Sequence, residues 1–318
     1  MITFPDEVQV AYSRSKNIIR KTPLDHSPSL SNIIDGDVYL KLDNIQKTGS
    51  FKFRGAISKM TSLNEKQRKK GVVTASTGNH GAAVSLSMKI LGISGSIIVP
   101  ENIAPNKVEN IKNLGGTVEY FGNDCLEAEQ RAQEISVTTG STYISPYNDP
   151  MIIAGQGTIG VELNEDLSNI DTVIVAVGGG GLISGIGGYL KTVQPNLEMI
   201  GCSPKNSCVM YESLQAGTIL DLPSKPTLSD GTAGGVEENS ITFAICKEII
   251  NDFVLLSEDE IAAGIRNGLE DHHQLIEGSA GAAIAAFKKR ETELNGKTVV
   301  IVICGGNISS NTLREVLA

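Results

Sequence analysis

The stretch TVIVAVGGGGLISGIGG, residues 172–188, decides the fold class of this chain. It opens with a β-branched apolar run, Thr172–Val177, which is typical of a strand buried on both faces. Gly178–Gly181 follow at once, and apolar residues at helical spacing then predict a helix. Glycines let the backbone approach a ligand, and the N–H groups at a helix start attract an anion, so we expect a phosphate-binding turn here. The alternative, a turn that only serves helix–strand packing, accounts poorly for four glycines in succession.

The same alternation of short strands and longer helical patterns runs through the whole chain. Strands are expected at Val38–Leu42, Gly71–Ser76, Ser96–Val99, Thr117–Phe121, Thr142–Ser145, Thr172–Val177, Met199–Ser203, Phe253–Leu256 and Thr298–Cys304. Helical patterns lie between most of them, for example at Gly81–Leu91 and Ile152–Leu167. Alternation of this kind predicts an α/β fold with parallel strands and crossover helices.

The chain length indicates how this fold is divided. A chain of 318 residues favours two domains over a single core. Two polar, turn-rich breaks, Asn64–Gly71 and Ser145–Pro150, bound an inner segment. We therefore expect a small domain at 65–146, inserted into a large domain made of residues 1–64 and 147–318. Each domain is expected to be a mainly parallel sheet flanked by helices.

Composition argues against several classes of function. The formal net charge is −9 and aromatic residues make up 4% of the chain, so we expect neither nucleic acid nor a membrane as partner. The five cysteines are odd in number and form no C-x-x-C pair, which is typical of a reducing compartment. The N-terminal stretch lacks the apolar core of a secretion signal, and the longest apolar runs are strand length. These features predict a cytoplasmic protein.

Two further strands run into small polar residues, STGNHG at Ser76–Gly81 and CGGN at Cys304–Asn307. Ligands of open α/β sheets bind outside the carboxyl ends of strands, so the three junctions together predict one shared pocket. The hydroxyls and N–H groups of STGNHG suit a substrate carboxylate, although an ordinary N-cap run has the same composition. Cys304 is either a small buried apolar residue or a thiol beside the ring nitrogen of a cofactor.

The tetraglycine does not match the common nucleotide motifs. Its spacing does not fit G-x-G-x-x-G, and the next strand, Met199–Ser203, ends without the acidic residue that would hold a ribose. The tripeptide at 296–298 resembles the end of a Walker motif, but Glu291 stands at the position of the first glycine. A small phosphate monoester therefore fits better than a nucleotide.

Lys52 is the candidate nucleophile, because it lies between Phe51 and Phe53 at the start of a helical pattern. Aromatic neighbours desolvate an amine, which lowers its pKa and makes it a better Schiff-base former. The alternative is a surface lysine whose aliphatic stem packs on its neighbours. Spacing alone does not decide between the two.

Four motifs occur in a fixed order along the chain: S-F-K-x-R-G-A, S-x-G-N-H-G, G-G-G-G-L and C-G-G-N. In this combination the sequence resembles the fold type II enzymes that depend on pyridoxal 5'-phosphate (PLP), the tryptophan synthase β family. The stretches PYNDPMIIAGQGTIGVEL and LIEGSAGAAIAAF are similar to the threonine/serine dehydratases and serine racemases within it. The resemblance spans essentially the whole chain and implies that PLP lies in the cleft between the two domains.

The resemblance also implies a role for individual residues. Lys52 would form the Schiff base with PLP and act as the catalytic base, and Thr77 would present a hydroxyl acid on the opposite ring face. The other residues expected at the cofactor are Phe51 and Glu277 near the ring, Asn79 at the ring hydroxyl, Cys304 at the pyridine nitrogen, and Gly178, Gly179, Gly180, Gly181 and Leu182 at the phosphate. The substrate carboxylate would be held by Ser76, Thr77, Gly78 and His80.

One departure from the family bears on metal binding. Metal-activated relatives carry an acidic pair after the strand that ends here at Ser203, whereas this chain has Ser203 and Val209 at the apparent positions. We therefore expect no metal.

The expected activity is PLP-dependent removal of ammonia from L-serine or L-threonine, giving a 2-oxo acid. A racemase or dehydratase acting on serine or 3-hydroxyaspartate is the alternative enzyme, since Thr77 keeps a hydroxyl where racemases of the family carry serine. A regulatory module that binds a phosphorylated ligand without turnover is the alternative outside catalysis. The resemblance further implies a homodimer.

Overall fold

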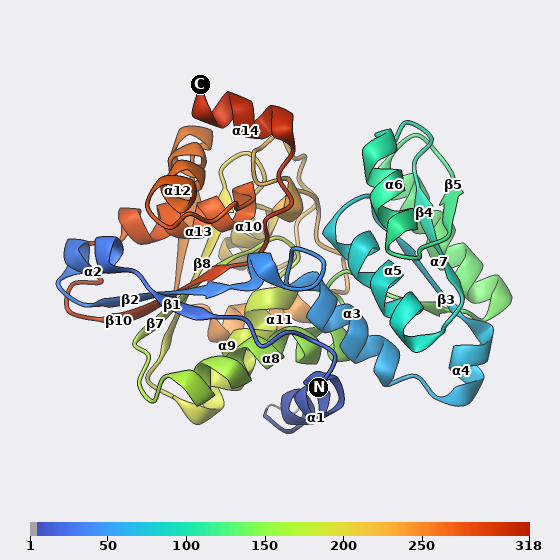
Figure 1. Ribbon diagram of the computed structural model, residues 1–318, viewed down its shortest axis with the longest axis horizontal. Helices are drawn as coiled ribbons and strands as arrows, with labels where there is room; N and C mark the ends of the chain where they lie inside the picture. The colour runs from blue at the N-terminus through green and yellow to red at the C-terminus, as the bar shows by residue number, and fades with distance from the viewer. Residues whose placement is uncertain (1–4) are drawn as a thin grey trace.

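The computed structural model describes residues 5–318, apart from the side chain of Asn106. Residues 1–4, which we assigned to the large domain, lie outside this range. The chain forms two sheets in separate lobes (Figure 1). One sheet has six strands in the order β1-β2-β10-β7-β8-β9, and the other has four in the order β5-β4-β3-β6. The expected α/β class is confirmed.

The strands are β1 (Leu24–His26), β2 (Asp37–Leu42), β3 (Val72–Ala75), β4 (Gly95–Val99), β5 (Val118–Tyr120), β6 (Thr142–Tyr143), β7 (Thr172–Ala176), β8 (Glu198–Pro204), β9 (Asp252–Leu256) and β10 (Thr298–Ile303). The helices are α1 (Asp6–Ser15), α2 (Pro28–Ile34), α3 (Lys52–Thr61), α4 (Glu65–Lys70), α5 (Asn79–Leu91), α6 (Pro105–Asn113), α7 (Cys125–Thr139), α8 (Pro150–Asp166), α9 (Gly181–Val193), α10 (Val209–Ala216), α11 (Ile241–Ile249), α12 (Glu258–Glu270), α13 (Gly278–Lys289) and α14 (Ser310–Leu317). Two 3-10 turns complete them, η1 (Asp43–Ile45) and η2 (Asp230–Thr232).

All nine expected strands are present, with ends shifted by at most two residues. Strand β1 was missed, because a three-residue edge strand with the sequence LDH has no apolar pattern. It pairs antiparallel with β2, whereas the other strand pairs of both sheets are parallel. The four-stranded sheet falls between residues 72 and 143. The domain bounds, 65–146 for the small domain and 1–64 with 147–318 for the large one, remain our proposal.

The core explains why the central strands carry apolar side chains on both faces. Strand β7 is buried at every position, and α13 packs against β7, β8, β9 and β10. The second core lies under the four-stranded sheet and includes Phe53, Ile57 and Met60 of helix α3. Helix α3 also packs on α8, so the helix that starts at Lys52 contacts both lobes (Figure 1).

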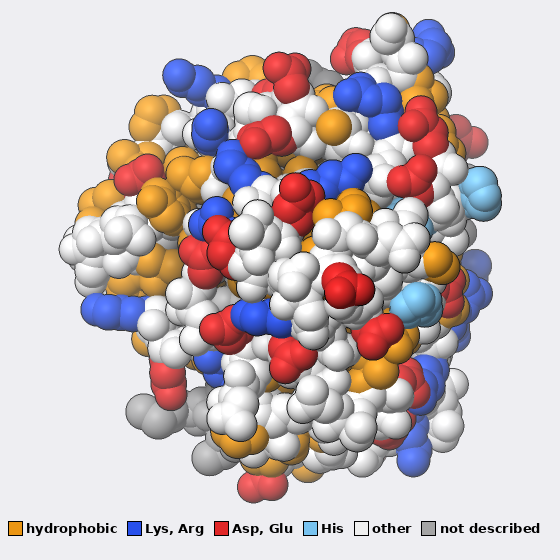
Figure 2. Space-filling model, turned by 90° about the vertical axis from the view of Figure 1, so that its left-hand side faces the viewer, with side chains coloured by type: hydrophobic (Ala, Val, Ile, Leu, Met, Phe, Trp, Pro, Cys, Tyr) orange, Lys and Arg blue, Asp and Glu red, His pale blue; other side chains and the backbone are white. Residues whose placement is uncertain are grey.

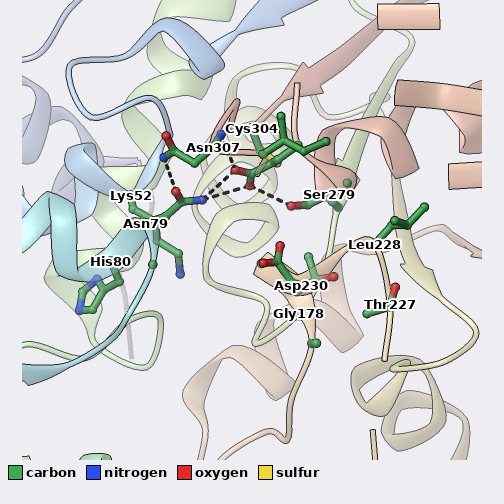
Figure 3. A pocket seen from close by; sticks show the side chains of 18 of the residues that line it. Lys52, Asn79, His80, Gly178, Thr227, Leu228, Asp230, Ser279, Cys304 and Asn307 are labelled. Carbon is green, nitrogen blue, oxygen red and sulfur yellow. Dashed lines mark hydrogen bonds between the residues drawn. The ribbon is translucent and has the colours of Figure 1, made fainter. Parts of the chain in front are cut away.

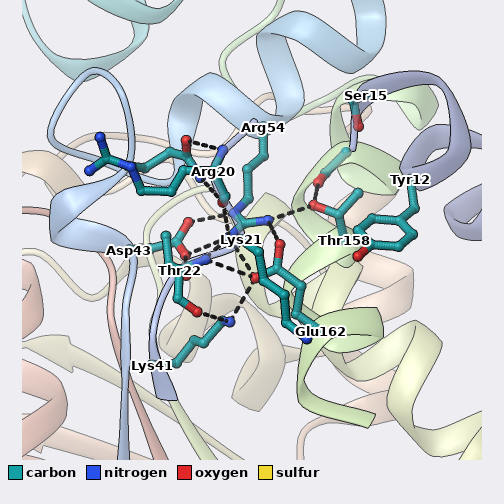
Figure 4. A network of polar contacts seen from close by, with 12 residues as sticks. Tyr12, Ser15, Arg20, Lys21, Thr22, Lys41, Asp43, Arg54, Thr158 and Glu162 are labelled. Carbon is teal, nitrogen blue, oxygen red and sulfur yellow. Dashed lines mark hydrogen bonds and ion pairs between the residues drawn. The ribbon is translucent and has the colours of Figure 1, made fainter. Parts of the chain in front are cut away.

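A buried network of charges fixes the start of α3 to the six-stranded sheet (Figure 4). Arg54 donates from Nε to Oδ2 of Asp43 at 2.6 Å and from Nη1 to Oε1 of Glu162 at 2.6 Å. Lys41 lies 2.6 Å from Oε2 of the same Glu162, and none of these four side chains is exposed. Two cations thus balance two carboxylates, which is the condition for keeping charges in an interior.

Acidic and basic side chains are interspersed on the face that Figure 2 shows. Within residues 5–318, helices long and apolar enough to cross a membrane are absent.

Candidate active site

A cavity of about 1480 Å³ lies where β3, β7 and β10 end and α3 begins (Figure 3). Every site residue expected from the sequence lines it: Phe51, Lys52, Ser76, Thr77, Gly78, Asn79, His80, Gly178, Gly179, Gly180, Gly181, Leu182, Glu277 and Cys304. These residues come from five separate stretches of the chain, so the expected shared pocket is present.

Lys52 is the first residue of α3, and its half-buried side chain forms part of the cavity wall. Its Nζ donates to the carbonyl oxygen of Pro146 at 2.9 Å and lies 5.2 Å from the centre of the Phe51 ring. Burial lowers the pKa of Lys52 to about 8, although the nearby Glu277 acts in the opposite direction. An appreciable share of the amine is therefore unprotonated near neutral pH, as a nucleophile or base requires.

The tetraglycine forms the turn between β7 and α9, as the sequence predicted. Gly180 adopts φ +82, a left-handed conformation that favours glycine, and as the N-cap it has no side chain to occupy the first turn of α9. A Cβ on Gly179 would lie 2.6 Å from the ring of Tyr147, and one on Gly178 would lie 2.7 Å from the carbonyl oxygen of Thr232. The backbone N–H groups at this helix start are thus left for an anion.

The STGNHG segment forms a second glycine-capped helix start, since β3 ends at Ala75 and Gly78 is the N-cap of α5. The side chain of Ser76 accepts from the N–H of Gly78 at 3.2 Å, and Gly78, as the N-cap, has no side chain with which to cap the first turn of α5. Hydroxyl and N–H donors around an uncapped helix start can bind a carboxylate.

His80 lies in this first turn with its ring directed at the four-stranded sheet. Its Nε2 lies 2.9 Å from the carbonyl oxygen of Ile144. A carbonyl only accepts, so Nε2 carries the hydrogen. Burial, with the charge of Lys52 as a second cause, lowers the pKa of His80 to about 3. The imidazole is therefore neutral, and what His80 offers a carboxylate is its place in the helix start rather than a positive charge.

Glu277 is the centre of the polar contacts in the cavity. It is 3% exposed and accepts from Nδ2 of Asn79 at 3.1 and 3.0 Å, from Oγ of Ser279 at 2.9 Å and from the N–H of Asn307 at 3.2 Å. Cys304 is buried nearby, and burial raises the pKa of its thiol well above the usual value. The thiol therefore stays protonated and can only act as a weak donor or acceptor.

The third junction enters its helix later than the other two. Strand β10 ends at Ile303, but helix α14 begins only at Ser310, and Ser309 caps it by accepting from the N–H of Thr312 at 3.0 Å. A capped helix start six residues away provides no anion site at the strand end. The segment instead turns Asn307 back toward Asn79.

Three residues of the site were not assigned a role from the sequence: Tyr147, Ser279 and Asn307. Each stands in a stretch that carried the family resemblance, PYNDP, EGSAG and CGGN. Their positions follow from tertiary packing, for example the ring of Tyr147 on the tetraglycine, and local pattern does not report such packing. The loop around Asp230, which also lines the cavity, has no periodicity that could have indicated its place.

Ser203 and Val209 stand where metal-activated relatives carry an acidic pair, and neither is an acid here. Oγ of Ser203 donates to the carbonyl oxygen of Val177 at 2.5 Å, and Val209 is buried at the start of α10. The part of the chain that the structure describes contains no group of three or more His, Cys, Asp or Glu side chains placed to hold a metal ion.

Comparison with known proteins gives a consistent result. A family profile described as pyridoxal-phosphate dependent enzyme matches residues 16–305. An L-threonine ammonia-lyase of Thermotoga maritima is 41% identical over 317 residues, which cover 100% of this chain and 78% of that protein. A catabolic L-threonine dehydratase of Escherichia coli is 36% identical over 313 residues, covering 98% and 95% of the two chains. Maize serine racemase superposes with a TM-score of 0.93 at 30% identity, over 100% of this chain and 97% of the other. Threonine deaminase isoform 2 from Solanum lycopersicum superposes with a TM-score of 0.91 at 32% identity, over 99% and 93%.

Proposed function

The chain belongs to the family of pyridoxal-phosphate dependent enzymes, and on this premise we propose that it is an ammonia-lyase for L-threonine or L-serine. It would eliminate water from the β-hydroxy amino acid and release a 2-oxo acid and ammonia. The names of its relatives, L-threonine ammonia-lyase and dehydratase, support an enzyme over a module that only binds a phosphorylated ligand.

The residues of the cavity fit PLP in their chemistry. In the turn at 178–181, Tyr147 and Thr232 lie too close to the backbone to allow a Cβ, so the turn presents backbone N–H groups to a phosphate. Lys52 supplies an amine with a pKa of about 8 in the same cavity, able to condense with an aldehyde. We propose that these two parts hold the cofactor, with Asn79, Glu277 and Cys304 around its ring.

The chemistry is divided between cofactor and protein. When bound, PLP supplies an aldehyde for the amine of the substrate and a ring that takes up the charge released at Cα. We propose that Lys52, once displaced, takes the proton from Cα, because its lowered pKa suits a general base. The uncapped start of α5, with the hydroxyls of Ser76 and Thr77, would hold the substrate carboxylate.

The observation that carries this proposal is the position of Lys52, whose amine lines one cavity together with the tetraglycine turn. The test is an assay for 2-oxo acids over a panel of β-hydroxy amino acids that includes serine, threonine and 3-hydroxyaspartate. We expect L-threonine or L-serine to give the highest rate and the Lys52→Ala variant to give none. Lys47→Ala removes an exposed lysine five residues away and is the matched control. A panel that yields no 2-oxo acid, or a Lys52→Ala variant that is as active as the parent, would refute the assignment.

Racemisation of serine is a second candidate, favoured by the superposition on maize serine racemase and by the hydroxyl of Thr77 in the cavity. Chiral analysis of the serine that remains in the same assay separates the two reactions. D-Serine in excess of pyruvate would favour the racemase.

We also propose that the enzyme is a cytoplasmic homodimer. The five thiols, Cys125, Cys202, Cys208, Cys246 and Cys304, are all free, which supports a reducing compartment. Light scattering of the purified holoenzyme tests the dimer.

A further inference from the structure

Asn307 contacts two other groups that fix the orientation of its amide (Figure 3). Its Nδ2 donates to the carbonyl oxygen of Thr48 at 3.1 Å and to Oδ1 of Asn79. The oxygen of a backbone carbonyl only accepts, so the atom of Asn307 that faces Thr48 must be the nitrogen. The opposite side of the amide packs closely on Gly49, where an added Cβ would lie 2.8 Å from Oδ1 of Asn307.

The orientation of Asn307 determines that of Asn79. A nitrogen of Asn307 faces Asn79, so the atom of Asn79 that it meets must be the acceptor, Oδ1. Nδ2 of Asn79 then faces Glu277, whose two oxygens lie 3.1 and 3.0 Å away and accept. The carbonyl of Thr48 at one end and the carboxylate of Glu277 at the other thus fix which atom of each amide is the donor and which is the acceptor. No second arrangement of the two amides satisfies all of these contacts.

Because its oxygen is bonded by Asn307, Asn79 can present only an N–H donor to the cavity that it lines. Two near-equal distances to Glu277 are those expected when one hydrogen is shared between both carboxylate oxygens. The second hydrogen on Nδ2 then remains for a ligand, while Oδ1 is occupied by Asn307. Asn79 is therefore a donor toward the cavity, even before any ligand binds.

We propose that Asn307 is a positioning residue that holds Asn79 as a hydrogen-bond donor to the ring hydroxyl oxygen of bound PLP. This inference rests on the proposed function, since it needs PLP in the cavity. A donor at this oxygen stabilises its ionised form. Loss of the positioning contact therefore raises the pH at which the absorbance of the bound cofactor changes, and it weakens the binding of PLP.

The test is a spectroscopic pH titration of holoenzyme carrying Asn307→Leu, a neutral side chain of similar size that cannot donate. We expect the midpoint of the absorbance change to rise by about one pH unit and the dissociation constant of PLP to increase about tenfold. Asn307→Ser serves as a second variant if the leucine prevents folding. Asn44→Leu is the matched control, because Asn44 also donates to a backbone carbonyl, at 3.3 Å from Leu275, but does not line the cavity.

A double-mutant cycle with Asn79→Ala separates positioning from a general effect on the loop. We expect the Asn307 substitution to shift neither the midpoint nor the PLP affinity in the Asn79→Ala background, because Asn307 acts through Asn79. Parent-like midpoints in both Asn307 variants, or an equal shift in Asn44→Leu, would overturn the proposal. If such a result is found while the 2-oxo acid assay is normal, only this inference is rejected. If the expected shift is found while the panel yields no 2-oxo acid, only the proposed reaction is rejected.

Discussion

Replacing Arg54 by methionine removes one cation from the buried network that fixes the start of α3 (Figure 4). The parent network contains two cations, Lys41 and Arg54, and two carboxylates, Asp43 and Glu162, all fully buried. Its net charge is zero and becomes −1 in the variant. A buried charge that loses its partner costs about 3–5 kcal/mol, so we expect the free energy of unfolding to fall by that amount.

A second substitution checks that charge, rather than lost packing, causes the effect. Glu162→Gln in the Arg54→Met background leaves Lys41 with Asp43 and returns the net charge to zero. We expect this double variant to recover about 1 kcal/mol or more, because the uncompensated carboxylate is gone.

Urea unfolding of the holoenzymes, followed by circular dichroism, measures these differences through the midpoint and slope of the transition. Lys21→Met is the control, since Lys21 pairs with Glu165 and Asp166 at the surface, where it is 49% exposed. An exposed pair of this kind contributes about 0–1 kcal/mol. Equal losses in Arg54→Met and Lys21→Met would refute the reasoning.

Two further predictions concern the cofactor site directly. Gly179→Ala places a Cβ 2.6 Å from the ring of Tyr147, so the turn must shift. The affinity for PLP, measured by equilibrium titration, should then fall at least about tenfold. The control variant Gly235→Ala, whose Cβ would meet nothing within 4 Å, should retain the parent affinity. The amine of Lys52 is unprotonated above its lowered pKa of about 8, so the rate at which apoprotein captures PLP should rise with pH and level off above about 8 in stopped-flow absorbance. A rate that keeps rising toward 10.5, the ordinary lysine value, would contradict the lowered pKa.

The parts of the fold that could be predicted are those whose signal is local. The apolar run before Gly178 indicated both a buried strand and a turn into a helix, because burial on two faces and a close backbone approach each demand particular residue types. Strand β1 carried no such signal, since it is held at the sheet edge by pairing with β2 alone.

The sequence identified the residues of the site but not all of the contacts that they make. Lys52 and the STGNHG segment reach the cavity as expected, yet the imidazole of His80 is directed at Ile144, which depends on where β6 and α5 pack. Asn307 was part of a recognised motif, but its contact with Asn79 joins two segments 228 residues apart. Contacts of this kind follow from the assembled fold and leave no periodicity in the sequence.

The proposed chemistry requires, above all, a covalent bond between Lys52 and PLP. Borohydride treatment of the holoenzyme fixes this linkage, and peptide mapping by mass spectrometry then locates the modified residue. We predict that the cofactor is attached to the peptide that contains Lys52 and that Lys47, on the neighbouring surface, is unmodified. Attachment to another lysine, or a holoenzyme in which no lysine is modified, would contradict the account.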